Sequence, residues 1–244
     1  MPRKINWFKY ASPVTFYPLA GKLLPWFAAG AAVLVVAGLY IGFFVAPTDH
    51  VQGDAYRIIF IHVPAAWMSM FIYLIMAGYA VATLVVRTRL SAMMVEALAP
   101  TGALFTFIAL WSGAFWGRPT WGAWWVWDAR LTSELILLFL YFGYFALHSA
   151  LGKDARADRA AALLVLVGAV NVPIIYFSVQ WWNTLHQGAS VRLTAAPRMA
   201  QVMLTGMLLM ALAAWLYAIA VALARVRCII RERDGRAGTW EGAP

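Results

Sequence analysis

The chain has 244 residues, 64% of them hydrophobic and 12% charged, with a formal net charge of +9. Soluble domains carry about 25% charged residues, so this chain has too few charges to cover a water-exposed surface. The basic residues gather at the ends of apolar stretches, which indicates membrane topology and contact with a lipid bilayer and argues against nucleic acid as a partner. The single cysteine, Cys228, excludes an internal disulfide and a zinc site of several cysteines.

Six stretches are long and apolar enough to cross the hydrocarbon core, which takes about 20 helical residues. They are expected at about 26–46, 64–86, 94–116, 131–150, 160–180 and 200–224. Backbone groups in lipid have to bond within their own segment, so we predict an all-α integral membrane bundle of six transmembrane helices. We expect it to form a single domain over residues 1–244, with an uncleaved first span.

Three local features refine these spans. Pro64 is a favourable first residue for the second span. Pro173 is expected to kink the fifth span, and Asn171 beside it to bond to a neighbouring helix. Residues 225–244 are expected to form a basic cytoplasmic tail that is exposed and poorly ordered.

Lysine and arginine are unevenly distributed between the two ends of the spans. The N-terminus, the loops after even spans and the C-terminal tail hold 4, 2, 3 and 5 of them, which is 14 of the 19. The loops after odd spans, at 47–63, 117–130 and 181–199, hold the other five. The positive-inside rule therefore predicts cytoplasmic termini and places these three loops together on the outer face.

Six of the thirteen tryptophans lie between Trp111 and Trp127. The densest part of this segment contains Trp116, Trp121, Trp124, Trp125 and Trp127. One interpretation is an aromatic belt at the membrane interface. The alternative, favoured by four indoles in seven residues, is an interfacial helix with Asp128 on the same face, forming an aromatic shelf for a flat π-system. Asp128 could equally cap the fourth span.

Two of the four histidines, His62 and His186, fall just outside predicted spans on the outer side. Each alone is more often structural, but together they could supply both axial ligands of one haem iron. Arg130, and after it Arg57, could pair with the haem propionates. Arg130 is also spaced for a structural i,i+4 pair with Glu134.

The other two histidines are expected to have no such role: His50 is a loop residue without neighbours that suggest a site, and His148 is read as structural.

The run from Trp121 to Glu134, WGAWWVWDARLTSE, resembles the tryptophan-rich WWD signature of haem-handling proteins. Chain length, six spans and the position of the run between spans three and four are similar to the CcmC family, the haem exporter proteins C of system I cytochrome c maturation. The resemblance implies that haem b is bound transiently at the periplasmic face of the bacterial inner membrane. It implies contacts from the tryptophan-rich loop and axial ligation by His62 and His186.

The same resemblance implies delivery of haem to the chaperone CcmE, alongside the ABC transporter subunits CcmA and CcmB and the small membrane protein CcmD. We expect the chain to be a haem-transfer platform, and the sequence leaves open whether it also promotes the covalent bond between haem and the chaperone. Two alternatives remain open. A haem lyase acting on apocytochrome is disfavoured by the short chain, and an ABC permease is disfavoured by short inner loops and by the scarcity of polar residues within the spans.

Overall fold

The computed structural model describes residues 9–152, 154–186, 188, 191 and 199–236, and for 235–236 the backbone only. These residues form helices joined by short loops and contain no β-strand. Six of the helical segments are long and apolar enough to cross a membrane. The prediction of an all-α membrane bundle with six spans is therefore confirmed.

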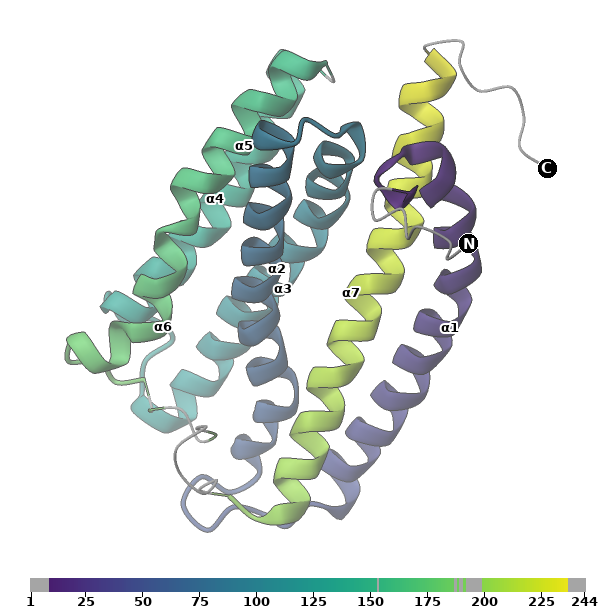
Figure 1. The fold of residues 1–244 in the computed structure, drawn as a ribbon. Helices are drawn as coiled ribbons and strands as arrows, with labels where there is room; N and C mark the ends of the chain where they lie inside the picture. Colours follow the sequence, from purple (N-terminus) through teal and green to yellow (C-terminus); the bar gives the residue numbers. More distant parts are fainter. Residues whose placement is uncertain (1–8, 153, 187, 189–190, 192–198, 237–244) are drawn as a thin grey trace, which may run out of the picture.

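The spans alternate in direction, so the start of α1 and the end of α7 lie at the same end of the bundle (Figure 1). α1 packs along α7, and α2 contacts α3, α5 and α7. The helices in chain order are α1 (Pro13–Tyr40, continued by a π-helical turn at Ile41–Val45), α2 (Ile59–Val85, preceded by a 3-10 turn at Asp54–Ile58), α3 (Arg89–Trp121), α4 (Ala129–Leu151), α5 (Ala155–Ala169), α6 (Asn171–Trp181) and α7 (Gln201–Arg236).

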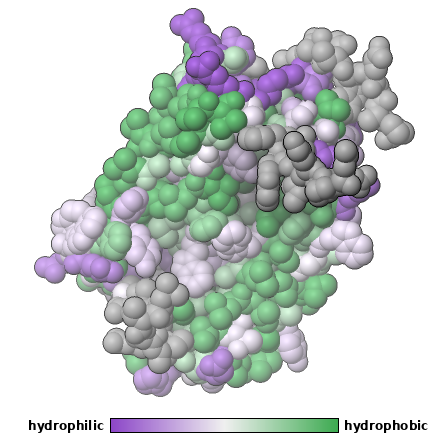
Figure 2. Space-filling view, viewed as in Figure 1, coloured by the Kyte–Doolittle hydropathy of each residue, from purple (hydrophilic) through white to green (hydrophobic). Residues whose placement is uncertain are grey.

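α2 and α3 lie at the centre of the bundle and α1 at its edge. The most apolar 18 residues are 61% buried in the second span and 67% in the third, but 17% buried in the first. Close packing in this core depends on small residues, because a Cβ added to Gly102 of α3 would lie 2.1 Å from the hydroxyl of the fully buried Tyr141 of α4. On the face shown in Figure 2, apolar side chains cover much of the surface and polar residues lie toward the two ends, as lipid contact requires.

The fifth span is broken into two helices, as its proline predicts. α5 ends at Ala169 and α6 begins at Asn171. A proline ring clashes with the carbonyl four residues earlier, and for Pro173 that carbonyl belongs to Ala169. The break brings Asn171 against α4, where its Nδ2 donates to the carbonyl of Ser133 at 2.8 Å. Both predictions for this span are confirmed.

The expectation of an exposed, poorly ordered tail from residue 225 is wrong for its described part. α7 continues to Arg236, and Val226 and Ile230 are buried. Arg233 explains this extension, because its guanidinium bridges Glu96 of α3 at 2.6 Å and Asp158 of α5 at 2.8 Å. Residues 237–244 lie outside the described part.

Candidate functional site

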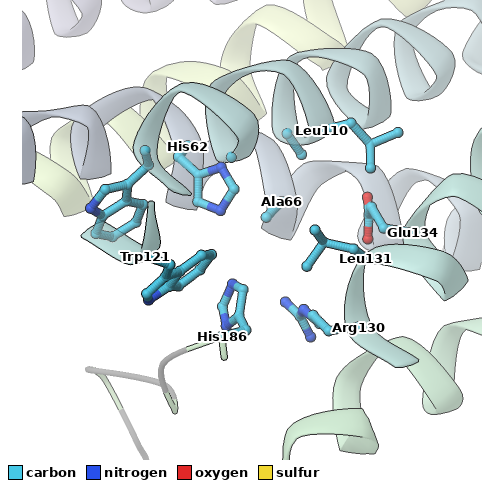
Figure 3. A pocket seen from close by; sticks show the side chains of 11 residues that line it. His62, Ala66, Leu110, Trp121, Arg130, Leu131, Glu134 and His186 are labelled. Carbon is cyan, nitrogen blue, oxygen red and sulfur yellow. The ribbon is translucent and has the colours of Figure 1, made fainter. Parts of the chain in front are cut away.

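A cavity opens at the end of the bundle where α3 ends and α2 and α4 begin (Figure 3). The empty space between its walls, including the part that is open to solvent, is about 650 Å³. Its wall is largely apolar. The chemically distinctive side chains in it are His62, Trp116, Trp121, Arg130, Glu134 and His186. Segments from three separate parts of the chain thus converge on one cavity.

His62 projects from α2 into this cavity and is 9% exposed. Its Nδ1 lies 3.0 Å from the hydroxyl of Ser112 on α3, and that hydroxyl donates to the carbonyl of Ile108 at 2.5 Å. A hydroxyl has one proton, so Ser112 accepts from Nδ1–H of His62. This assignment leaves Nε2 unprotonated, the state in which an imidazole binds a metal.

The expected place of His62 needs one correction. Helix α2 begins at Ile59 and not at Pro64, so His62 belongs to the first turn of the helix and is not just outside it. The 3-10 turn at Asp54–Ile58 leads directly into α2 and accounts for the earlier start. A helical residue is held more rigidly than a loop residue, which suits a ligand that has to keep its direction.

His186 reaches the same cavity from the non-helical segment after α6. The two histidine side chains point toward one another (Figure 3), and their ring centroids are 6.3 Å apart with planes inclined by 37°. The ring of Trp121 lies beside that of His186, at 6.3 Å between centroids. The pair that the sequence singled out is therefore brought together from segments 124 positions apart.

Asp128 joins this segment to the start of α4. Its Oδ1 accepts the backbone N–H of Leu131 at 2.8 Å, which confirms the predicted N-cap. Its Oδ2 accepts a short hydrogen bond from the hydroxyl of Thr184. The oxygen of that hydroxyl in turn accepts the backbone N–H of His186 at 3.1 Å.

Arg130 and Glu134 place one cationic and one carboxyl group in the apolar cavity. Arg130 donates from Nη1 to the carbonyl of Ile175 at 2.6 Å. Glu134 accepts from the hydroxyl of Ser69 on α2 at 2.6 Å. The two charges of the i,i+4 pair still attract one another, but each side chain makes its hydrogen bond to a different helix, and both line the cavity.

The loop between α1 and α2 does not line the cavity but holds one of its wall residues, Trp116, in place. Asp49 accepts the N–H groups of Gln52 at 2.8 Å and Val51 at 2.9 Å. These bonds, that from Gln52 first, hold the pKa of the Asp49 carboxyl below its ordinary value. The ordered loop directs Gln52 Oε1 to the indole N–H of Trp116 at 2.7 Å, and Trp116 packs edge-on against His62.

Known proteins resemble this chain over most of its length. A family model described as "Heme exporter protein C" matches residues 6–241. The chain belongs to the CcmC family. A Heme exporter protein C of Escherichia coli (strain K12) is 53% identical over 180 residues, which cover 74% of each chain.

Two relatives with lower identity cover different shares of the chain. A protein of the same name from Bradyrhizobium diazoefficiens is 48% identical over 226 residues, 93% of this chain and 86% of the relative. A "Putative cytochrome c biosynthesis ccmC-like mitochondrial protein" of Marchantia polymorpha is 48% identical over 158 residues, 65% of this chain and 67% of the relative. Six spans and this family make the chain a multi-pass membrane protein.

The tryptophan run that first suggested the CcmC family does not form the predicted helical shelf. α3 ends at Trp121, and Gly122 follows in a left-handed conformation with φ 76°. Such a glycine stops a helix, and residues 122–128 are non-helical. Trp116 and Trp121 remain on the cavity wall because they belong to α3.

The other tryptophans of the run point elsewhere. Trp124 packs on Phe115 at 5.3 Å between centroids, and 53% of it is exposed. Trp127 is 78% exposed and packs against Trp125. The cavity wall contains none of the indoles of Trp124, Trp125 and Trp127. The geometry of the cavity therefore does not support the haem-binding role that was expected of them.

Arg57 is likewise absent from the cavity wall. It donates to the carbonyl of Gly42 at 2.6 Å and pairs with Asp54 at 2.9 Å, and so ties the end of the first span to the start of the second. At the opposite end of the bundle His148 packs against Tyr144, 4.7 Å between centroids.

Sequence reasoning missed three polar residues of the site. They are isolated polar side chains in or next to apolar segments: Ser112, Glu134 and Thr184. Their spacing in the sequence gives no signal, because the site residue that each one bonds to lies on another helix or loop. Only Glu134 could have been noticed, since an ionisable residue inside a predicted span favours a functional role.

Proposed function

We propose that this CcmC-family protein binds haem at the outer face of the membrane through His62 and His186 and passes it to the haem chaperone CcmE. Family membership supports a general role in haem handling for cytochrome c maturation. Ligation by His62 and His186 is supported by the separation of their two rings, 6.3 Å between centroids.

This separation suits one iron atom between two imidazoles. Two metal–nitrogen bonds of about 2 Å, added to the distances from each nitrogen to its ring centre, give about 6 Å. The bond from His62 to Ser112 supports the same assignment, because a ligating histidine usually gives its second ring N–H to a fixed acceptor.

The rest of the cavity suits an apolar, flat cargo with acidic groups at one edge. Trp116 and Trp121 offer indole surfaces for stacking and apolar burial. Arg130, next to His186 in Figure 3, is the cation available to a propionate. The largely apolar wall around it strengthens that attraction, because water screens it less.

The sidedness of the site follows from the charge distribution. The end opposite the cavity carries most of the lysines and arginines, including those of the helix ends around Arg89 and Arg225. We infer that this end is cytoplasmic and that the cavity faces the periplasm of a bacterial inner membrane. Haem b is then a transient cargo, and CcmA, CcmB and CcmD are the expected partners of an ABC-type complex.

A ligand-replacement series tests the proposal. The protein carrying His62→Ala and His186→Ala together is purified beside His50→Ala and His148→Ala controls. The double variant is expected to insert into membranes but to lose the six-coordinate low-spin haem spectrum and haem transfer to purified apo-CcmE. The controls are expected to keep both. A double variant with an unchanged spectrum would remove the ligand assignment.

A further inference from the structure

A hydrogen-bonded link joins the aspartate of the tryptophan-rich run to the loop that carries His186. We propose that Asp128 and Thr184 are positioning residues that hold His186 in its iron-binding place. The proposal rests on the function proposed above and adds two residues to it that do not themselves touch the cargo.

Each bond in the link has a defined donor and acceptor. The Thr184 hydroxyl donates its single proton to Asp128 Oδ2, and a lone pair of the same oxygen accepts the N–H of His186 at 3.1 Å. Because the first acceptor is a carboxylate, that bond is charge-assisted and stronger than a neutral one. The Thr184 hydroxyl thus connects the Asp128 carboxylate to the backbone of His186.

The other carboxylate oxygen fixes this link to a rigid element. Asp128 Oδ1 caps α4 through the N–H of Leu131 at 2.8 Å. Arg130 lies in the first turn of the same helix and lines the cavity. The start of α4 therefore sets the position of both Arg130 and the segment that carries His186. The two side chains are thereby held in a fixed position relative to one another.

The two histidines differ in what holds them. His62 belongs to a helix, and its ring is fixed by the hydrogen bond that Nδ1–H donates to the Ser112 hydroxyl. His186 follows the end of α6 at Trp181 and lies in a segment without regular structure. The bond from its backbone N–H to the Thr184 hydroxyl ties this segment to Asp128 at the start of α4.

Loss of this bond should therefore affect one ligand and not the other. In Thr184→Val the shape of the side chain is kept and the hydroxyl is removed. We expect haemin-loaded protein to show a five-coordinate, high-spin component in its absorption and resonance Raman spectra. Haem transfer to excess apomyoglobin should become roughly five- to tenfold faster, as for the loss of one or two hydrogen bonds. Free imidazole should restore the low-spin spectrum.

Two matched variants separate positioning from a general effect on folding. Thr184→Ser keeps the hydroxyl and should behave as the unmodified protein. Thr120 lies near the end of α3, and its buried hydroxyl has no hydrogen-bond partner among the described residues. Thr120→Val removes this hydroxyl and should also leave the haem spectrum unchanged. If Thr184→Val does not accumulate in membranes, Asp128→Asn serves instead, because asparagine still caps α4 but loses the carboxylate acceptor of Thr184.

The outcomes distinguish this proposal from the function on which it rests. A low-spin spectrum and an unchanged transfer rate in Thr184→Val, with His186→Ala high-spin, would refute positioning and leave the ligand assignment in place. A low-spin spectrum in His186→Ala would refute the ligand assignment itself. Loss of ligation in Thr184→Ser to the same extent as in Thr184→Val would also refute the role of the hydroxyl.

Discussion

Ser112→Ala is the most informative single change outside the ligand pair. It removes the acceptor for Nδ1–H of His62, 3.0 Å away, and leaves the helix intact because alanine is a strong helix former. The other contacts of this hydroxyl, to the carbonyls of Ile108 and Ala109, are made within α3. The variant therefore isolates the effect of the serine on the histidine ring.

The size of the effect follows from what else holds the ring. A neutral hydrogen bond contributes about 1 kcal/mol, and loss of an outer-shell partner of a ligating histidine costs roughly 10- to 100-fold in affinity. Trp116 packs edge-on against His62 at 5.5 Å between centroids, and a Cβ at Gly113 would lie only 3.0 Å from the ring. Because these contacts still restrict the ring, we expect the lower limit, about tenfold weaker haem binding.

Titration of detergent-solubilised protein with haemin measures this affinity. Ser178→Ala is a matched control, since Ser178 is also buried and bonds to a carbonyl of its own helix, Ile175 at 2.8 Å. Ser112→Ala should bind haemin about tenfold more weakly than the control. Equal affinities would refute the role of the Ser112 hydroxyl in holding the His62 ring.

Three further changes test other parts of the account. Trp121→Leu should speed haem loss roughly three- to tenfold in a transfer assay, while Trp124→Leu changes it little, because only the first indole lines the cavity. Arg130→Gln should lower affinity for haemin roughly tenfold or more but not for its dimethyl ester, and equal losses for both would exclude a propionate contact. Gly102→Ala should lower stability by roughly 1–3 kcal/mol, seen as a lower melting temperature, because its Cβ would overlap a buried tyrosine. Gly78→Ala, with no atom within 4 Å of the added carbon, should not.

Features that depend on neighbouring residues could be predicted from the sequence. The six spans follow from length and hydropathy, and the break in the fifth span follows from Pro173. Asp128 as a cap needs only the helix that follows it. The choice of His62 and His186 used one long-range argument, that alternate loops share a side of the membrane, and the structure brings both side chains into one cavity.

Features that depend on distant partners could not be predicted. The extension of α7 is explained by Arg233, whose partners Glu96 and Asp158 are 137 and 75 residues away. The prediction of a helical tryptophan shelf was wrong for a different reason: Gly122 ends α3 in the middle of the tryptophan run. Thr184 has no pattern around it at all, and its bond to Asp128 exists only once α6 has returned to the start of α4.

Resonance Raman spectroscopy of the haemin-loaded protein tests the central claim most directly, because its spin-state bands report how many axial ligands the iron has. The account predicts a six-coordinate low-spin iron in the unmodified protein and a five-coordinate high-spin iron in each of His62→Ala and His186→Ala. A low-spin iron that persists in either single variant would show that the substituted histidine is not a ligand.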